Sequence, residues 1–117
     1  MTDRELLEAA AKACGIDGAY GVASDDYYYD GNVEGILTIL PDGQSYVWNP
    51  LTDDGDALRL AVNLQKLGVE LRLGRTNFLV GVGIGPYWCE EVTDPDPYAA
   101  TRRAIVRAAA EIGKEMK

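Results

Sequence analysis

The stretch WNPLTDDGDALRLAVNL, residues 48–64, marks the point where a predicted strand ends and a helix begins. Asn49-Pro50 breaks the strand, because the residue before a proline is held in extended or turn conformations. Apolar residues then recur at intervals of three and four, which is the spacing of one face of an amphipathic helix. These residues are Ala57, Leu60, Ala61, Leu64 and Leu67, and Gly68 is expected to end the helix.

The start of this helix carries three aspartates and a glycine, at positions 53–56. An EF-hand calcium loop beginning at Asp53 would have its glycine too early and Leu64 where a glutamate is required. A phosphate cradle is disfavoured, because aspartates repel phosphate. Thr52, Asp53 or Asp54 can instead cap the helix, and acids are favoured at the positive end of its dipole. We interpret these residues as helix caps, with metal binding and partner recognition as alternatives.

Strands are predicted on both sides of the central helix. The segment 36–48 has apolar runs on either side of Pro-Asp-Gly, which is typical of a hairpin turn. Further strands are predicted over 69–73, 78–84 and 87–92, and weaker ones over 20–23 and 27–29. Because hairpins connect antiparallel strands, we expect a mainly antiparallel sheet of four or five strands with helices packed on one side.

Helices are predicted at both ends of the sequence. The first covers residues 2–15, with Thr2 or Asp3 as its cap and Gly15 at its end. The last begins with Asp96 as cap and Pro97 in the first helical position. Its predicted apolar face consists of Tyr98, Thr101, Ile105, Ala108, Ile112 and Met116. The result is one α+β domain over residues 1–117, with three helices in the order α-β-β-α-β-β(-β)-α.

Composition excludes several kinds of chemistry. The 117 residues contain no histidine, which rules out Ser–His–Asp and Cys–His catalysis. The two cysteines, Cys14 and Cys89, are too few for a zinc site and are expected to be buried thiols and not a disulfide. No apolar run approaches the roughly 20 residues of a membrane span, and the N-terminus lacks signal-peptide character, so we expect a cytoplasmic protein.

Charge is distributed unevenly along the chain. The net charge is −8, but residues 98–117 carry +3, so the remainder carries −11. General nucleic-acid binding is therefore disfavoured. In the basic segment, Arg103, Arg107 and Lys114 share one helix face, with Arg102 beside them. This face is either solvated or a contact for phosphate or an acidic partner, and a DNA-binding modulator using Arg103 and Arg107 is a third hypothesis.

Aromatic residues supply the other candidate contacts. Tyr27, Tyr28 and Tyr29 lie in DDYYYDGNVEG, residues 25–35, which matches a calcium loop poorly. The tyrosines are either half-buried on a strand or part of an interface, where tyrosine is enriched. In GVGIGPYW, residues 81–88, the glycines do not form a dinucleotide-binding fingerprint; we expect a helix or another backbone to pack over them. Glu90 and Glu91 should point to opposite faces of a strand.

Two segments resemble small uncharacterised proteins encoded by bacteriophages and prophages. They are WNPLTDDGDALRLAVNL, residues 48–64, and DPYAATRRAIVRAAAEIG, residues 96–113, together with an opening helix such as RELLEAAAKACGI, residues 4–16. The resemblance covers the three predicted helices and leaves the strands, residues 17–47 and 68–94, unmatched. It implies a phage accessory protein of the bacterial cytoplasm and carries over no catalytic residue.

The sequence therefore predicts a non-enzymatic protein that binds a host or phage protein, with no metal, cofactor or catalytic residue. The expected contact residues are Tyr27, Tyr28, Tyr29, Trp88, Arg103 and Arg107. A homodimer is a further candidate arrangement, since exposed strand edges favour self-association. The alternative is a small-ligand or nucleotide-binding protein, or a cryptic enzyme, with Tyr27–Tyr29, Trp48, Trp88, Glu90 and Arg102 around a concave sheet.

Overall fold

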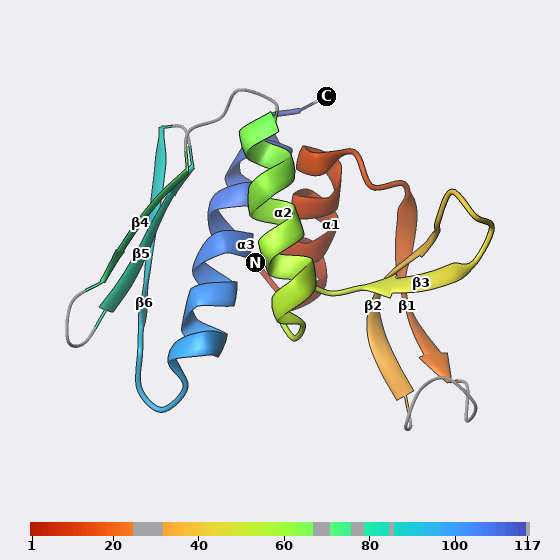
Figure 1. Ribbon diagram of the computed structural model, residues 1–117, viewed down its shortest axis with the longest axis horizontal. Helices are drawn as coiled ribbons and strands as arrows, with labels where there is room; N and C mark the ends of the chain where they lie inside the picture. Colours follow the sequence, from red (N-terminus) through yellow and green to blue (C-terminus); the bar gives the residue numbers. More distant parts are fainter. Residues whose placement is uncertain (25–31, 67–70, 76–78, 85, 117) are drawn as a thin grey trace.

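The computed structural model describes residues 1–24, 32–66, 71–75, 79–84 and 86–116. Its helices are α1 (Asp3–Cys14), α2 (Asp54–Lys66) and α3 (Pro97–Glu115). The first sheet contains β1 (Gly18–Ser24), β2 (Asn32–Ile39) and β3 (Ser45–Trp48), and the second contains β4 (Leu71–Arg75), β5 (Leu79–Ile84) and β6 (Tyr87–Val92). The helices form a central layer with one sheet on each side of it (Figure 1).

Both sheets are antiparallel meanders, in which neighbouring strands along the chain pair with each other. Ile36 of β2 lies opposite Tyr20 of β1 and Trp48 of β3. In the second sheet, Gly83 of β5 lies opposite Arg72 of β4 and Trp88 of β6. The α+β class, the three helices and the antiparallel pairing are thus confirmed. The single sheet of four or five strands with helices on one side is wrong, because the strands form two sheets of three.

The composition of α3 explains its position at the centre of the fold. Its buried residues are Ala100, Ala104, Val106, Ala108, Ala109, Ala110 and Gly113, which point in several directions around the helix. A helix that is apolar on more than one side must be covered on more than one side. In the structure α3 packs against α1, α2, β5 and β6. The second sheet thus covers one side of α3 and the other two helices cover further sides, while the first sheet packs against α1.

The predicted apolar face of α3 is only partly correct. Ala108 is fully buried, and Ile105 and Ile112 are partly buried against the core. Tyr98 and Met116, however, are 69% and 43% exposed. The face was predicted from its large apolar side chains, whereas α3 contacts its neighbours mainly through buried alanines. Small residues suit a central helix because they let neighbouring backbones approach closely.

The helix boundaries follow from local capping. Thr2 accepts a hydrogen bond from the Glu5 backbone N–H while the Glu5 carboxylate accepts one from the Thr2 N–H, which is a capping box. Gly15 ends α1 with a φ of 76°, a conformation that favours glycine. Asp96 caps α3 by accepting from the N–H groups of Tyr98 and Ala99. Thr2, Gly15, Asp96 and Pro97 therefore act as the sequence predicts.

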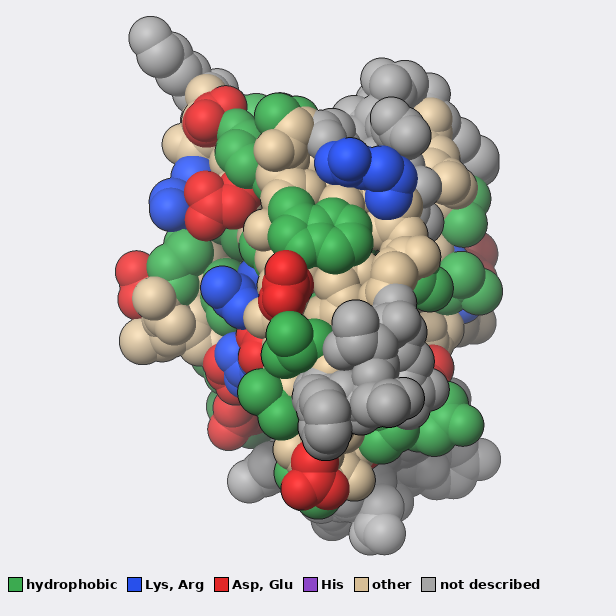
Figure 2. All heavy atoms as spheres, turned by 90° about the vertical axis from the view of Figure 1, so that its left-hand side faces the viewer, with side chains coloured by type: hydrophobic (Ala, Val, Ile, Leu, Met, Phe, Trp, Pro, Cys, Tyr) green, Lys and Arg blue, Asp and Glu red, His purple; other side chains and the backbone are tan. Residues whose placement is uncertain are grey.

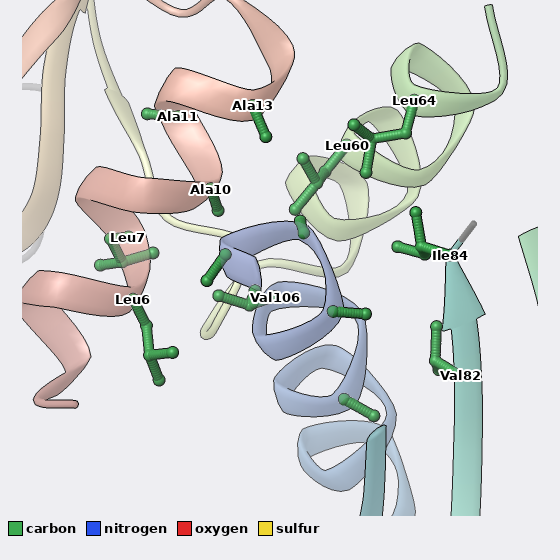
Figure 3. Close-up of a cluster of buried hydrophobic side chains, with 14 of the residues drawn as sticks. Leu6, Leu7, Ala10, Ala11, Ala13, Leu60, Leu64, Val82, Ile84 and Val106 are labelled. Carbon is green, nitrogen blue, oxygen red and sulfur yellow. The ribbon is translucent and has the colours of Figure 1, made fainter. Parts of the chain in front are cut away.

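The core runs through the helical layer toward both sheets. It contains leucines of α1 and α2 and Val106 of α3, and Val82 and Ile84 of β5 join it on the side of the second sheet (Figure 3). From the first sheet, Ile36 and Trp48 join the same cluster. Burial of this apolar surface is the main stabilising term in the fold.

Candidate interaction surfaces

The aspartates at the start of α2 are bound by their own chain. The Asp53 carboxylate accepts from the Asp56 backbone N–H at 2.8 Å and so caps the helix. Asp54 forms an ion pair with Arg102 of α3 at 2.6 Å. Thr52 does not cap the helix; its hydroxyl donates to the Asn49 carbonyl instead. The capping interpretation is confirmed for Asp53.

Asp56 occupies a different position, inside the protein. It is 1% exposed and accepts hydrogen bonds from the Asn49 backbone N–H at 2.9 Å, the Arg59 guanidinium at 2.9 Å and the Tyr46 hydroxyl. Burial and the hydrogen bond to Asp56 raise the pKa of Tyr46 to about 12, so this hydroxyl stays protonated and continues to donate. Asp56 thus connects α2 to β3 and to the Asn49-Pro50 corner. Because its side chain is buried, a substrate cannot reach it.

Acidic and cysteine side chains form no potential metal site in the described part of the chain. Within it, no group of three or more Asp, Glu or Cys side chains is placed to hold a metal ion. Cys14 and Cys89 are free, partly buried thiols. Burial raises the pKa of both thiols, which disfavours the nucleophilic thiolate.

The arginines of α3 link this helix to its neighbours. Besides pairing with Asp54, Arg102 donates to the Leu51 carbonyl at 2.8 Å. Arg103 pairs with Asp3 of α1 at 2.9 Å, and Arg107 pairs with Glu91 of β6 at 2.8 Å. The hydrogen bond to Glu91 raises the pKa of Arg107. A phosphate or acidic partner at Arg103 or Arg107 would compete with these pairs, so their role toward a partner stays a prediction.

Trp88 lies on the outer face of the second sheet, over glycines of the neighbouring strand. A Cβ atom added at Gly81 would lie 2.1 Å from Trp88 Cζ2, and one added at Gly83 would lie 2.9 Å from Cε3. Only glycine therefore lets the indole lie flat on β5. The packing predicted over these glycines is supplied by a side chain, and the expected helix or backbone is wrong.

Polar neighbours fix the position of the indole. Trp88 Nε1 donates to Glu90 Oε1 at 2.7 Å, and the Arg72 guanidinium carbon lies 5.9 Å from the ring centroid, within the range of a cation–π contact. Trp88 is 48% exposed, and Val92 on the same face is 61% exposed. We name Arg72, Trp88, Glu90 and Val92 the Trp88 face. Figure 2 views this side of the molecule, where hydrophobic side chains lie beside basic and acidic ones.

The two glutamates of β6 separate as the sequence predicts. Glu91 points toward α3, where it pairs with Arg107, whereas Glu90 lies on the outer face with Trp88. They therefore cannot act together as an acid and a base on one substrate.

Among the described residues, Trp48 and Arg102 are not brought to this face. Tyr27, Tyr28 and Tyr29 lie outside the described residues. Trp48 is 4% exposed and belongs to the first sheet, and Arg102 holds Asp54 and Leu51. Of the described residues proposed for a small-ligand site, Trp88 and Glu90 are neighbours, whereas Trp48 and Arg102 lie apart from them.

Two hollows on the surface are built from residues that already have partners. One, of about 360 Å³, is bordered by Asp3, Tyr20, Glu34 and Asn49. There the Tyr20 hydroxyl donates to Glu34 at 2.7 Å, and Asp3 pairs with Arg103. The other, of about 310 Å³, lies between α2 and α3 and is mostly apolar, with Leu58, Tyr98 and Ile105 on its walls. Neither arrangement resembles a nucleophile activated by a base.

Comparisons with known proteins give no match, whether with family models, curated proteins or solved structures. In the described residues, no helix combines the length and apolar character needed to cross a membrane. Function is therefore argued from the geometry of the surfaces.

Proposed function

We propose that the chain is a non-enzymatic accessory protein that acts by binding another protein, as its phage-like segments imply. The Trp88 face is its main contact surface. The role is placed in the bacterial cytoplasm, where the resemblance locates such proteins.

The observation that supports this proposal is that Trp88, which is half exposed, lies flat against Gly81 and Gly83 of the neighbouring strand. Tryptophan and arginine are among the residues that contribute most to binding energy at interfaces. Trp88 is fixed on one side by Gly81 and Gly83 and at its edge by Glu90. A side chain that is already ordered loses less conformational entropy on binding, which favours affinity.

The acidic and basic groups of the face would orient a partner. Glu90 accepts a hydrogen bond from the indole N–H and Arg72 lies over the ring, so a complementary surface needs an apolar centre with one basic and one acidic group near it. The net charge of −8 favours encounter with a basic partner at low salt. Mutual charge pairing affects the rate of association and the choice of partner more than the final affinity.

The test compares capture of host and phage proteins by the wild-type chain with capture by a Trp88→Ala variant. We expect a specific partner to be recovered by the wild type, and its purified form to bind Trp88→Ala at least about 30-fold more weakly, as for a hot-spot residue. Tyr98→Ala is the matched control, because Tyr98 is an exposed aromatic on α3 and lies outside the Trp88 face. It should bind like the wild type.

A third variant separates the position of the indole from its presence. Gly81→Ala keeps Trp88 but lifts it from β5, so binding should weaken while the chain remains folded by circular dichroism. Failure to recover any specific partner, or equal binding by Trp88→Ala and wild type, would contradict the proposal.

A further inference from the structure

The indole of Trp88 presents one face of its ring system to solvent. Its other face lies against the second sheet, because atoms of the six-membered ring cover Gly81 and Gly83 of β5. The ring also reaches toward Gly74 of β4, where an added Cβ would lie 3.4 Å from Cη2. Trp88 is 48% exposed, so the face turned away from the glycines is open. A flat aromatic ring fixed in this way is a platform on which a planar group can stack.

A carboxylate lies at one edge of this platform. Glu90 is exposed, and its Oε1 accepts a hydrogen bond from Trp88 Nε1 at 2.7 Å. The indole N–H is neutral, so this bond orients the carboxylate without balancing its charge. The two oxygens of a carboxylate can accept further hydrogen bonds from a partner. Any protein that covers the indole also covers Glu90, and covering a carboxylate is costly unless a cation meets it.

We infer that the partner's basic group at the Trp88 face is an arginine, whose guanidinium stacks on the open face of the indole and donates to the Glu90 carboxylate. The inference rests on the proposed function, since it names the chemical class of partner for the same surface. Cations are attracted to aromatic ring faces, most strongly to that of tryptophan. Arginine meets both requirements at once, because its planar guanidinium stacks on rings and directs paired N–H groups at a carboxylate.

The protein already has one contact of this type at the same ring. The Arg72 guanidinium carbon lies 5.9 Å from the Trp88 ring centroid. Arg72 Nε and Trp88 Cε3 lie 2.8 Å and 2.9 Å from the position of a Cβ at Gly83, so Arg72 approaches the indole beside Cε3. Glu90 is bound at Nε1, on the other long edge of the ring system. A second guanidinium is therefore nearest to Glu90 and farthest from Arg72 when it lies over the five-membered ring.

Long-range electrostatics favour the same class of partner. The chain has a net charge of −8, so it attracts a basic segment and repels an acidic one before they touch. This attraction does not distinguish arginine from lysine, whereas stacking on the indole does. The expected partner is a protein segment with an exposed arginine and few acidic residues around it.

The test is a titration of the 117-residue chain with three short peptides. Each is blocked at both ends and carries arginine, lysine or citrulline between two glycines; citrulline has the shape of arginine without its charge. The readout is the indole N–H resonance of Trp88 in a ¹H–¹⁵N spectrum, with that of the buried Trp48 as internal reference. We expect the arginine peptide to shift the Trp88 resonance along a saturating curve at millimolar concentrations. The lysine peptide should bind several-fold more weakly, and the citrulline peptide should give no saturating shift.

Glu90→Gln separates the charge of the carboxylate from the position of the indole. The glutamine amide oxygen can still accept from Trp88 Nε1, so the ring should stay in place. Affinity for the arginine peptide should nevertheless fall about tenfold, because a hydrogen bond between two charged groups is lost. Glu8→Gln is the matched control. It removes the same charge from α1, where the Glu8 side chain is 48% exposed, and it should bind like the wild type.

Equal binding of the arginine and citrulline peptides would overturn the inference. So would an arginine peptide that leaves the Trp88 resonance unmoved, that shifts Trp48 equally, or that binds Glu90→Gln as tightly as the wild type. An equal loss in Glu8→Gln would also overturn it, because net charge alone would then explain the effect. None of these measurements uses a captured partner. A partner that binds through Trp88 without an arginine would contradict this inference and leave the proposed function intact.

Discussion

Replacing Asp56 by alanine is expected to lower the free energy of unfolding by about 3 kcal/mol, because buried hydrogen-bonding groups would lose their partner. The Asn49 backbone N–H and the Tyr46 hydroxyl both donate to Asp56, which is 1% exposed. For a chain of this length, the loss corresponds to a fall in Tm of roughly 10–15 °C. Thermal and urea denaturation at neutral pH measure both quantities.

Asp54→Ala is the matched control for this prediction. Its side chain also begins α2 and also pairs with an arginine, but it is 70% exposed. Exposed ion pairs contribute about 1 kcal/mol or less, so the control should unfold close to the wild type. If the two variants were destabilised equally, the structural role assigned to Asp56 would be wrong.

Gly113→Ala is expected to destabilise the protein by about 2 kcal/mol or more, although alanine favours helices over glycine by about 1 kcal/mol. An added Cβ would clash with the backbone carbonyl oxygen of Ala9 in α1. A backbone atom cannot turn aside as a side chain can, so α1 and α3 must move apart. Burial of Ala10 and Ala109 at 0% exposure leaves little room for that movement.

Gly55→Ala provides the same substitution without the clash. In α2, an added Cβ at Gly55 would meet only the ends of the Arg59 and Asp53 side chains, at 3.1 Å and 3.2 Å. Asp53 caps the helix and Arg59 pairs with Asp56, so they must shift by a few tenths of an ångström, which the higher helix propensity of alanine offsets; this variant should unfold close to the wild type. Chemical denaturation measures the free energy of unfolding of both variants. If Gly113→Ala were as stable as Gly55→Ala, the close packing of α1 against α3 would be contradicted.

Local features of the fold could be predicted from the sequence because their causes are local. Caps at Thr2, Asp53 and Asp96 depend on a few neighbouring atoms, and Gly15 depends on its own backbone angle. The division of the strands into two sheets depends on which helix each set of strands packs against, which is a long-range property. The alanines of α3 could have indicated its central position, because small residues on several sides of a helix allow other elements to pack closely on each of them.

The surfaces were less predictable for the same reason. Trp88 was identified from its residue type, but its place on Gly81 and Gly83 depends on the register of β5 with β6. Arg72 was missed as its neighbour, because it lies on β4, two strands away from Trp88. For the first sheet, the run Ile36-Leu37-Thr38-Ile39 places apolar residues on both faces. That departure from alternation could have indicated that Leu37 and Ile39 are exposed.

We propose that the carboxylates of this chain stabilise its own fold and that the protein acts through contact with another protein. A thermal-shift screen with divalent cations and nucleotides tests both points together, since any ligand that binds the folded state raises Tm. We expect no significant shift in Tm with Mg²⁺, Ca²⁺, Mn²⁺, Zn²⁺ or any nucleotide. A stabilisation of several degrees that disappears in Asp53→Asn or Asp54→Asn would contradict it.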